Sequence, residues 1–190
     1  GGRLPVVYPN RLEDSPAMHD YAPVDGVQRY TEGEWYGWRG QARNGVEPLI
    51  AFGHGLSYGE SSWGAPRVAV DASWPKCEVT VPVSCISARP VTVVVQCYVR
   101  KLGDLNPPRL AGWSKHEVAA ATHREVVVNI PWTAFRRWNP SRRAWHVAGG
   151  EWEVLVAASS VDVRAHLSVV IDECESGPSR GSDQPPDRPG

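Results

Sequence analysis

One short segment in the N-terminal third of the chain has the spacing of a catalytic serine motif. Residues 55–59 read GLSYG, which satisfies the G-x-S-x-G pattern of the α/β-hydrolase nucleophile. That chemistry requires a strand before the serine and a helix after it. Gly64 and Pro66 follow closely, so we expect no helix at this position. The rest of the chain also lacks alternating strands and helices, and the sequence therefore disfavours Ser57 as a nucleophile.

A neighbouring pair of carboxylates, Glu13 and Asp14, is the most suggestive local candidate for acid/base chemistry. Adjacent residues of an extended segment point in opposite directions, so the two groups are not expected to converge on one substrate. We expect them to be solvated or ion-paired.

Four cysteines, at positions 77, 85, 97 and 174, allow three disulfide pairings, and spacing alone does not choose among them. None forms a C-x-x-C pair, so we expect no zinc site, and we predict neither a metal nor a cofactor. The interpretation that we favour is small, buried hydrophobic residues with free thiols.

Nine tryptophans are many for 190 residues, and exposed indole rings can stack on sugars. Trp145 and Trp152 fall at strand positions that we expect to face a core. Five others, Trp63, Trp74, Trp113, Trp132 and Trp138, are harder to place, and Trp113, Trp132 and Trp138 are the candidates for contact with a sugar.

The overall charge is nearly balanced, with 20 Lys and Arg against 21 Asp and Glu. This balance argues against nucleic acid and against anionic membrane surfaces as partners. No run approaches the 18 or so apolar residues of a membrane helix, and no signal-peptide pattern opens the chain. The chain begins without Met, so the sequence leaves open what precedes it and whether the compartment is cytoplasmic or secreted.

The hydrophobic pattern divides the chain into segments. Residues 10–66 are rich in Gly, Pro, Tyr and Trp without sustained periodicity, which indicates an irregular connector that packs on a protein surface. Residues 67–174 contain seven or eight short alternating runs, as in an all-β fibronectin type III or immunoglobulin-like antiparallel sandwich. The apolar run 91–99 should be a central strand. Residues 175–190 should form a disordered tail.

Two N-terminal segments resemble a known family. Residues 47–58 read EPLIAFGHGLSY and resemble the EPL-x-PFGHGLSY signature of glycoside hydrolase family 3 β-glucosidases. Residues 2–9 read GRLPVVYP and resemble the end of that family's second, α/β domain, so residues 1–9 are assigned to its last segment.

The sandwich half is similar to the fibronectin type III-like domain that ends many family 3 enzymes. The similarity lies in residues 95–99 (VQCYV), 109–115 (RLAGWSK), 135–138 (FRRW) and 150–160 (GEWEVLVAASS). Several motifs in the right order make this resemblance specific.

The resemblance implies that both catalytic carboxylates lie upstream, in a barrel and an α/β domain of the same parent chain. The parent would hydrolyse terminal β-linked sugars without a cofactor, and this chain would be an inactive part that stabilises and orients those domains. The signature segment would then be structural. Gly53 and Gly55 would allow tight turns, His54 would be a hydrogen-bonded structural residue, and Phe52, Leu56 and Tyr58 would anchor the entry to the sandwich. A stand-alone module that binds carbohydrate or protein is the alternative.

Overall fold

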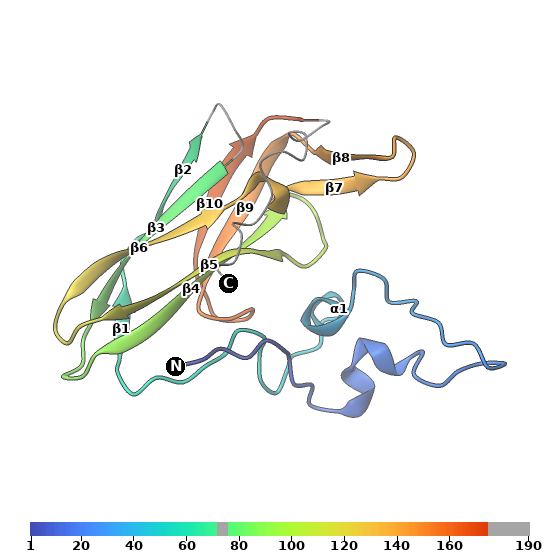
Figure 1. Ribbon diagram of the computed structural model, residues 1–190, viewed down its shortest axis with the longest axis horizontal. Helices are drawn as coiled ribbons and strands as arrows, with labels where there is room; N and C mark the ends of the chain where they lie inside the picture. The colour runs from blue at the N-terminus through green and yellow to red at the C-terminus, as the bar shows by residue number, and fades with distance from the viewer. Residues whose placement is uncertain (72–75, 175–190) are drawn as a thin grey trace, which may run out of the picture.

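The computed structural model describes residues 1–71 and 76–174. The tail expected at residues 175–190 lies outside the described residues. The N-terminal third runs along one side of a β-sandwich (Figure 1) and contains three short helical elements: η1 (Leu12–Asp14), η2 (Pro16–Met18) and α1 (Gly37–Arg43). Among the described residues, no helix is long and apolar enough to cross a membrane.

Two four-stranded antiparallel sheets form the sandwich, which confirms the predicted all-β fold class. In the first sheet β3 pairs with β1, β2 and β6: β1 (Ser61–Trp63), β2 (Arg67–Asp71), β3 (Lys76–Cys85) and β6 (His123–Ile130). The second sheet has the order β10-β9-β4-β5: β4 (Val91–Lys101), β5 (Arg109–Val118), β9 (Gly150–Ala157) and β10 (Val163–Ile171). A separate hairpin joins β7 (Arg136–Asn139) to β8 (Ala144–Val147) (Figure 1).

The core between the sheets follows the alternation of the strands. In β3 every odd position from Cys77 to Cys85 is buried, because successive side chains of a strand point to opposite faces. In β4 both faces are covered, and Val91 to Val99 is buried at almost every position. The prediction of a central strand at β4 is therefore confirmed, since β4 pairs with β5 and β9.

Pro82 lies opposite a break in the neighbouring edge of the sheet. β1 pairs with β3 up to Val83, and β2 resumes the pairing from Thr80, so no strand faces Pro82 on that side. Gly64, in the short link between β1 and β2, donates its N–H to the Pro82 carbonyl at 2.8 Å. Proline has no N–H to donate, and the break removes the need for one.

All four cysteines are free thiols, as expected. Cys77 and Cys97 are completely buried in the inner core. Burial raises the pKa of Cys77 to about 11. Burial, with a smaller contribution from neighbouring Cys77, raises the pKa of Cys97 to about 12. Both groups therefore pack as neutral hydrophobes.

Candidate functional site

The signature segment forms a loop against the N-terminal residues rather than a regular element. The N–H of Leu4 donates to the His54 carbonyl, and the N–H of Gly53 donates to the Leu4 carbonyl, both at 2.9 Å. Tyr8 forms an isolated antiparallel bridge with Ile50. The N-terminal residues therefore pair with the signature segment and lie with it on the sandwich.

A buried glutamine fastens this loop to the second sheet. The side-chain amide of Gln96, on β4, donates to the carbonyls of Gly53 (3.1 Å) and Ala158 (2.7 Å). Its oxygen accepts the Tyr98 hydroxyl at 2.6 Å. Unpaired buried polar groups are costly, so these bonds fix the position of the loop. The Ser160 N–H adds a bond to the Phe52 carbonyl at 2.9 Å.

The backbone of Gly53 requires glycine for two reasons. Its φ of +78° lies in the left-handed region, and a β-carbon there would collide with the amide of Gln96. Gly55 is similarly restricted, because a β-carbon would collide with the side chain of Arg3 and the carbonyl of Gly2.

A small apolar cluster surrounds these polar bonds on the outer face of the second sheet. Tyr98, Leu155 and Ala157 are buried from the sheet side, and Trp38 and Phe52 pack on them from the connector. The Trp38 ring stacks on Phe52 and meets Tyr98 edge-on, with centroids 5.5 Å apart in both pairs. The connector therefore covers the part of this face formed by β4 and β9.

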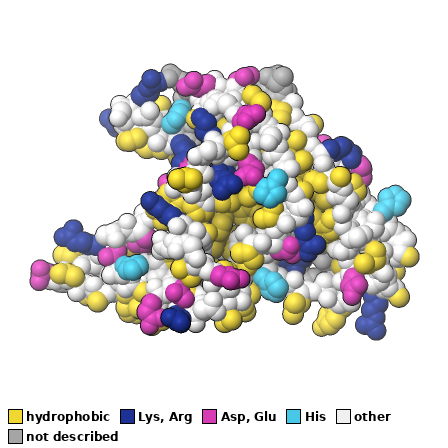
Figure 2. Space-filling view, turned by 180° about the vertical axis from the view of Figure 1, so that it is seen from behind, with side chains coloured by type: hydrophobic (Ala, Val, Ile, Leu, Met, Phe, Trp, Pro, Cys, Tyr) yellow, Lys and Arg dark blue, Asp and Glu magenta, His cyan; other side chains and the backbone are white. Residues whose placement is uncertain are grey.

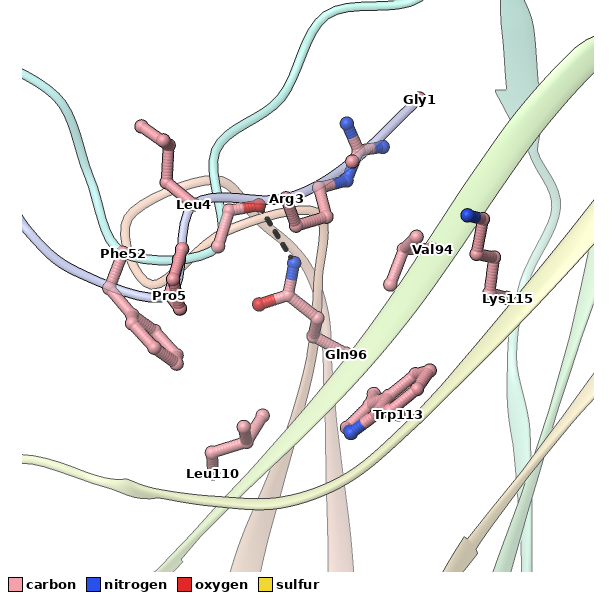
Figure 3. A pocket seen from close by; sticks show the side chains of 12 residues that line it. Gly1, Arg3, Leu4, Pro5, Phe52, Val94, Gln96, Leu110, Trp113 and Lys115 are labelled. Atoms are coloured by element: carbon pink, nitrogen blue, oxygen red, sulfur yellow. Dashed lines mark hydrogen bonds between the residues drawn. The ribbon is translucent and has the colours of Figure 1, made fainter.

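Where this cover ends, a groove of about 340 Å³ opens over β4 and β5 (Figure 3). Its lining is mostly apolar and includes Phe52, Val94, Leu110 and Trp113. The Trp113 side chain is 63% exposed. The groove thus continues the covered apolar cluster onto an open part of the same sheet face.

Two cations border the groove. Arg3 and Lys115 lie at the same end of it in Figure 3, and no Asp or Glu is among the lining residues. The Nε atom of Arg3 is buried and has no hydrogen-bond partner among the described residues. Burial lowers the pKa of Arg3 from its usual value. A buried guanidinium nitrogen without a hydrogen-bond partner is unfavourable unless an acceptor approaches it.

The structure does not place Ser57 on a nucleophile elbow. Ser57 is exposed, and residues 51–60 contain neither a strand nor a helix. His54 also has an exposed side chain, and its hydrogen bonds are made through the backbone. Of the three side chains expected to anchor the segment, Phe52 packs on the sandwich, whereas Leu56 is exposed and Tyr58 is 98% exposed.

The carboxylates of Glu13 and Asp14 lie in a short turn of the connector. Glu13 and Asp14 lie in η1, a short 3₁₀ turn instead of the extended segment that we expected. Asp14 accepts the Arg11 N–H at 3.1 Å. Glu13 is exposed. Elsewhere in the described ranges, no group of three or more His, Cys, Asp or Glu side chains could hold a metal ion.

The candidate sugar contacts fall in three different environments. Trp132 lies in the short η3 turn (Trp132–Ala134) and is 7% exposed, so its ring belongs to the core. Trp113 faces the groove. Trp138 is 49% exposed on the β7–β8 hairpin, where it meets Trp145 edge-on at 5.4 Å. The expectation that Trp145 faces the core is wrong, because its side chain is 43% exposed and packs on Trp138 of the same hairpin.

Sequence reasoning missed Gln96 and Arg3. A signal for Gln96 existed, because it is the only amide in the otherwise apolar run 91–99 and a buried amide needs partners. Arg3 had no such signal, since its burial depends on contact with residues more than 50 positions away.

Comparisons with known proteins agree with this architecture. A fibronectin type III-like domain matches residues 93–160. A β-glucosidase of Rhizobium radiobacter is 32% identical over 176 residues, and thermostable β-glucosidase B of Acetivibrio thermocellus is 29% identical over 178. These alignments cover 88% and 90% of this chain but only 22% and 23% of the relatives. The chain therefore spans about a fifth of the length of the curated relatives that it matches.

Solved structures show the same relation. DesR, a β-glucosidase from Streptomyces venezuelae in complex with D-glucose, has a TM-score of 0.83 at 28% identity, over 90% of this chain and 23% of that one. A family 3 β-glucosidase from Bifidobacterium adolescentis has a TM-score of 0.84 at 28% identity, over 96% of this chain and 28% of that one. The chain is therefore the counterpart of the C-terminal, fibronectin type III-like part of glycoside hydrolase family 3 β-glucosidases.

Proposed function

We propose that this chain is the structural, accessory portion of a β-glucosidase-like glycoside hydrolase. In the complete protein it stabilises and orients a barrel and an α/β domain that carry the catalytic groups. The parent removes terminal β-linked sugars without a cofactor, and this chain contributes no catalytic residue. Residues 1–9 form the end of the α/β domain, 10–66 the connector, whose last part adds β1 to the sandwich, and 67–174 the fibronectin type III-like domain.

The exposure of the connector carries this proposal. Its apolar side chains divide into a few that pack on the sandwich and many that point away from it. The exposed group of the connector comprises Leu12, Tyr21, Val24, Val27, Tyr30, Tyr36, Leu49, Leu56 and Tyr58, and Val6 and Tyr8 of residues 1–9 are exposed as well. Figure 2 shows hydrophobic side chains on the surface of the N-terminal segment as well as in the hollow between it and the sandwich. So much apolar surface on one segment is typical of an interface with more protein.

The chemistry of glycoside hydrolysis also supports an accessory role. Retention requires two carboxyl groups about 5 to 5.5 Å apart that flank the glycosidic bond. The strongest local pair, Glu13 and Asp14, lies in a turn in which Asp14 is engaged by the backbone. This arrangement offers no acid and nucleophile facing each other across a substrate.

The test compares the complete protein with variants of its anchor. Gln96→Leu removes the bonds that hold the signature loop, so the complete enzyme should lose activity faster on heating while its initial kcat/KM for an aryl β-glucoside changes less than about twofold. Thr92→Val, on the same strand, is the control. If the unchanged protein, Gln96→Leu and Thr92→Val were equally stable to heat, the result would contradict the proposal. Hydrolysis of a glucoside by residues 1–190 alone would contradict it as well.

A carbohydrate-binding module is the second candidate, and the exposed Trp138–Trp145 pair favours it. Arg136 also lies over the Trp145 ring, 4.5 Å from its centroid. Titration of residues 1–190 with glucan oligosaccharides should then quench tryptophan fluorescence, and Trp138→Ala should remove the response. Unchanged fluorescence at millimolar ligand excludes this candidate.

A further inference from the structure

We propose that the groove beside Trp113 is a socket for the catalytic part of the complete protein, and that it receives an apolar side chain with a carboxylate next to it in the same segment. This inference rests on the proposed function and deepens it. It specifies one contact surface, apart from the outward side of the connector, and the chemistry of the segment that occupies it.

The apolar floor of the groove favours an apolar occupant. Leu110 and Trp113 are exposed on β5, beside Val94 of β4 and the edge of Phe52. These side chains continue the cluster that Trp38 and Phe52 already cover on β4 and β9. Burial of apolar side chains at an interface is favourable, so an apolar occupant is stabilised by the same effect that holds Trp38 and Phe52 on the sheet.

The charges at the rim of the groove favour an occupant with a negative charge. Arg3 and Lys115 border one end of the groove, and its lining includes no carboxylate. The buried Nε of Arg3 lacks a partner among the residues that the structure describes. A carboxylate at this end would accept from the Arg3 guanidinium and lie near the Lys115 ammonium, which is the geometry that arginine recognises best.

A sugar is a poorer occupant of the same groove. Sugar hydroxyls need several free polar partners, and the only amide in the floor is already committed. Gln96 donates to two carbonyls and accepts the Tyr98 hydroxyl, so its hydrogen bonds are internal. The remaining lining is mainly apolar, with the two cations on the rim. An amphipathic peptide segment matches this distribution better than a neutral sugar does.

Two observations favour the same parent chain over a second copy as the source of the segment. The relatives extend far beyond the matched part, since the chain covers only 22% of the Rhizobium radiobacter β-glucosidase. The groove is also continuous with the N-terminal segment, because Gly1 to Pro5 form one of its walls. By its resemblance, that segment leads into the α/β domain, which places the groove beside the catalytic part.

Hydroxyl-radical footprinting of residues 1–190 and of the complete protein tests this inference directly. Mass spectrometry reads oxidation at Trp113, at Tyr30 on the connector, and at Trp138 on the hairpin as the internal control. We expect oxidation of Trp113 to fall at least about tenfold in the complete protein, as for a desolvated interface residue, and to be independent of concentration. Oxidation of Trp138 should change little.

Each other outcome of the footprinting has a distinct meaning. If Tyr30 becomes protected while Trp113 stays accessible, the socket is refuted and the proposed function stands. If both stay accessible, the proposed function itself fails. Protection of Trp113 that grows with concentration in residues 1–190 alone overturns the inference in favour of a second copy.

Zero-length carbodiimide cross-linking of the complete protein tests the charge at the rim. Lys115 should join to an Asp or Glu of the catalytic part, and Lys115→Glu should remove that product. Arg124→Glu, the same charge reversal on β6 of the opposite sheet, is the matched control and should retain it. A Lys115 without any cross-link to the catalytic part would overturn the proposed carboxylate.

Discussion

The outer face of the second sheet has two halves, one covered by the connector and one exposed. On β4 and β9, Tyr98 and Leu155 are buried under Trp38 and Phe52 of the connector. On β5, Leu110 and Trp113 carry comparable apolar side chains and remain exposed. Strand pattern does not separate the halves, because both present large hydrophobic groups outward. The difference is whether a segment covers them, and the cover is supplied by Trp38 and Phe52, which come much earlier in the chain than either strand.

The covered half also shows what makes such a cover specific. Apolar contact alone would allow the connector to slide, whereas the Gln96 side-chain amide donates to the Gly53 carbonyl and can do so only when that carbonyl is in one position. The left-handed backbone of Gly53 permits the close approach. One polar site within an apolar interface thus determines its register.

The largest expected effect on stability comes from removing Trp38, which covers β4 and β9 together with Phe52. Trp38→Ala removes the ring that stacks on Phe52 and meets Tyr98, so the free energy of unfolding of residues 1–190 should fall by about 3 kcal/mol. Urea denaturation followed by circular dichroism measures the change. A loss below about 0.5 kcal/mol, as for an ordinary surface position, would show that the connector is not bound to the sheet.

The next effect concerns the position that only glycine fits. Gly53→Ala places a β-carbon in the left-handed region and against Gln96, and it should destabilise the chain by about 2 kcal/mol. Gln96→Ala creates space for the methyl group but leaves the backbone strain. The double variant should therefore be more stable than the sum of the single changes predicts, and strict additivity in urea denaturation would argue against the collision.

Alkaline pH should destabilise the chain because the thiols of Cys77 and Cys97 are completely buried in the inner core. Burial holds the pKa of Cys97 at about 12, and that of Cys77 at about 11, whereas an unfolded thiol titrates near about 8.5. Between these values the unfolded state binds fewer protons, so the free energy of unfolding falls with rising pH, by up to about 1.4 kcal/mol per pH unit and thiol. Urea denaturation from pH 8 to 10.5 measures this slope.

The variant Cys97→Val is the control for that titration. It should remove the contribution of one thiol from the slope of the free energy of unfolding against pH. Burial also raises the pKa of Tyr98, on the covered outer face of the same strand. Trp38→Ala should therefore weaken the contribution of Tyr98 and leave that of Cys97 unchanged. An identical slope in wild type and Cys97→Val would contradict the assignment to the inner core.

The smallest effect is expected on the uncovered half. Trp113→Ala in residues 1–190 should change the free energy of unfolding by less than about 0.5 kcal/mol, because its ring is largely in water. Together with Trp38→Ala, this variant tests the difference between the covered and the exposed half of the sheet face, since a tryptophan is replaced by alanine at each. A loss near 3 kcal/mol at Trp113 would show that the groove is closed in solution.

The fold class followed from local patterns. The alternation in β3 and the continuous apolar run of β4 depend on residues within one strand, so the sequence predicted a sandwich and a central strand. The family resemblance was predictable for the same reason, because it rests on motifs such as residues 47–58. The helix α1 was not foreseen as such, since its two turns carry no periodicity long enough to detect.

The sequence by itself determined which strands form, how they alternate and which family they resemble, because these depend on side chains a few positions apart. Only the tertiary structure decided which outward-facing side chains are buried. Trp145 matched a core position yet lies on a hairpin outside the sandwich, while Gln96 looked out of place and proved to be the anchor of the signature loop. Burial depends on which distant segment packs against a face, and one-dimensional patterns do not carry that information.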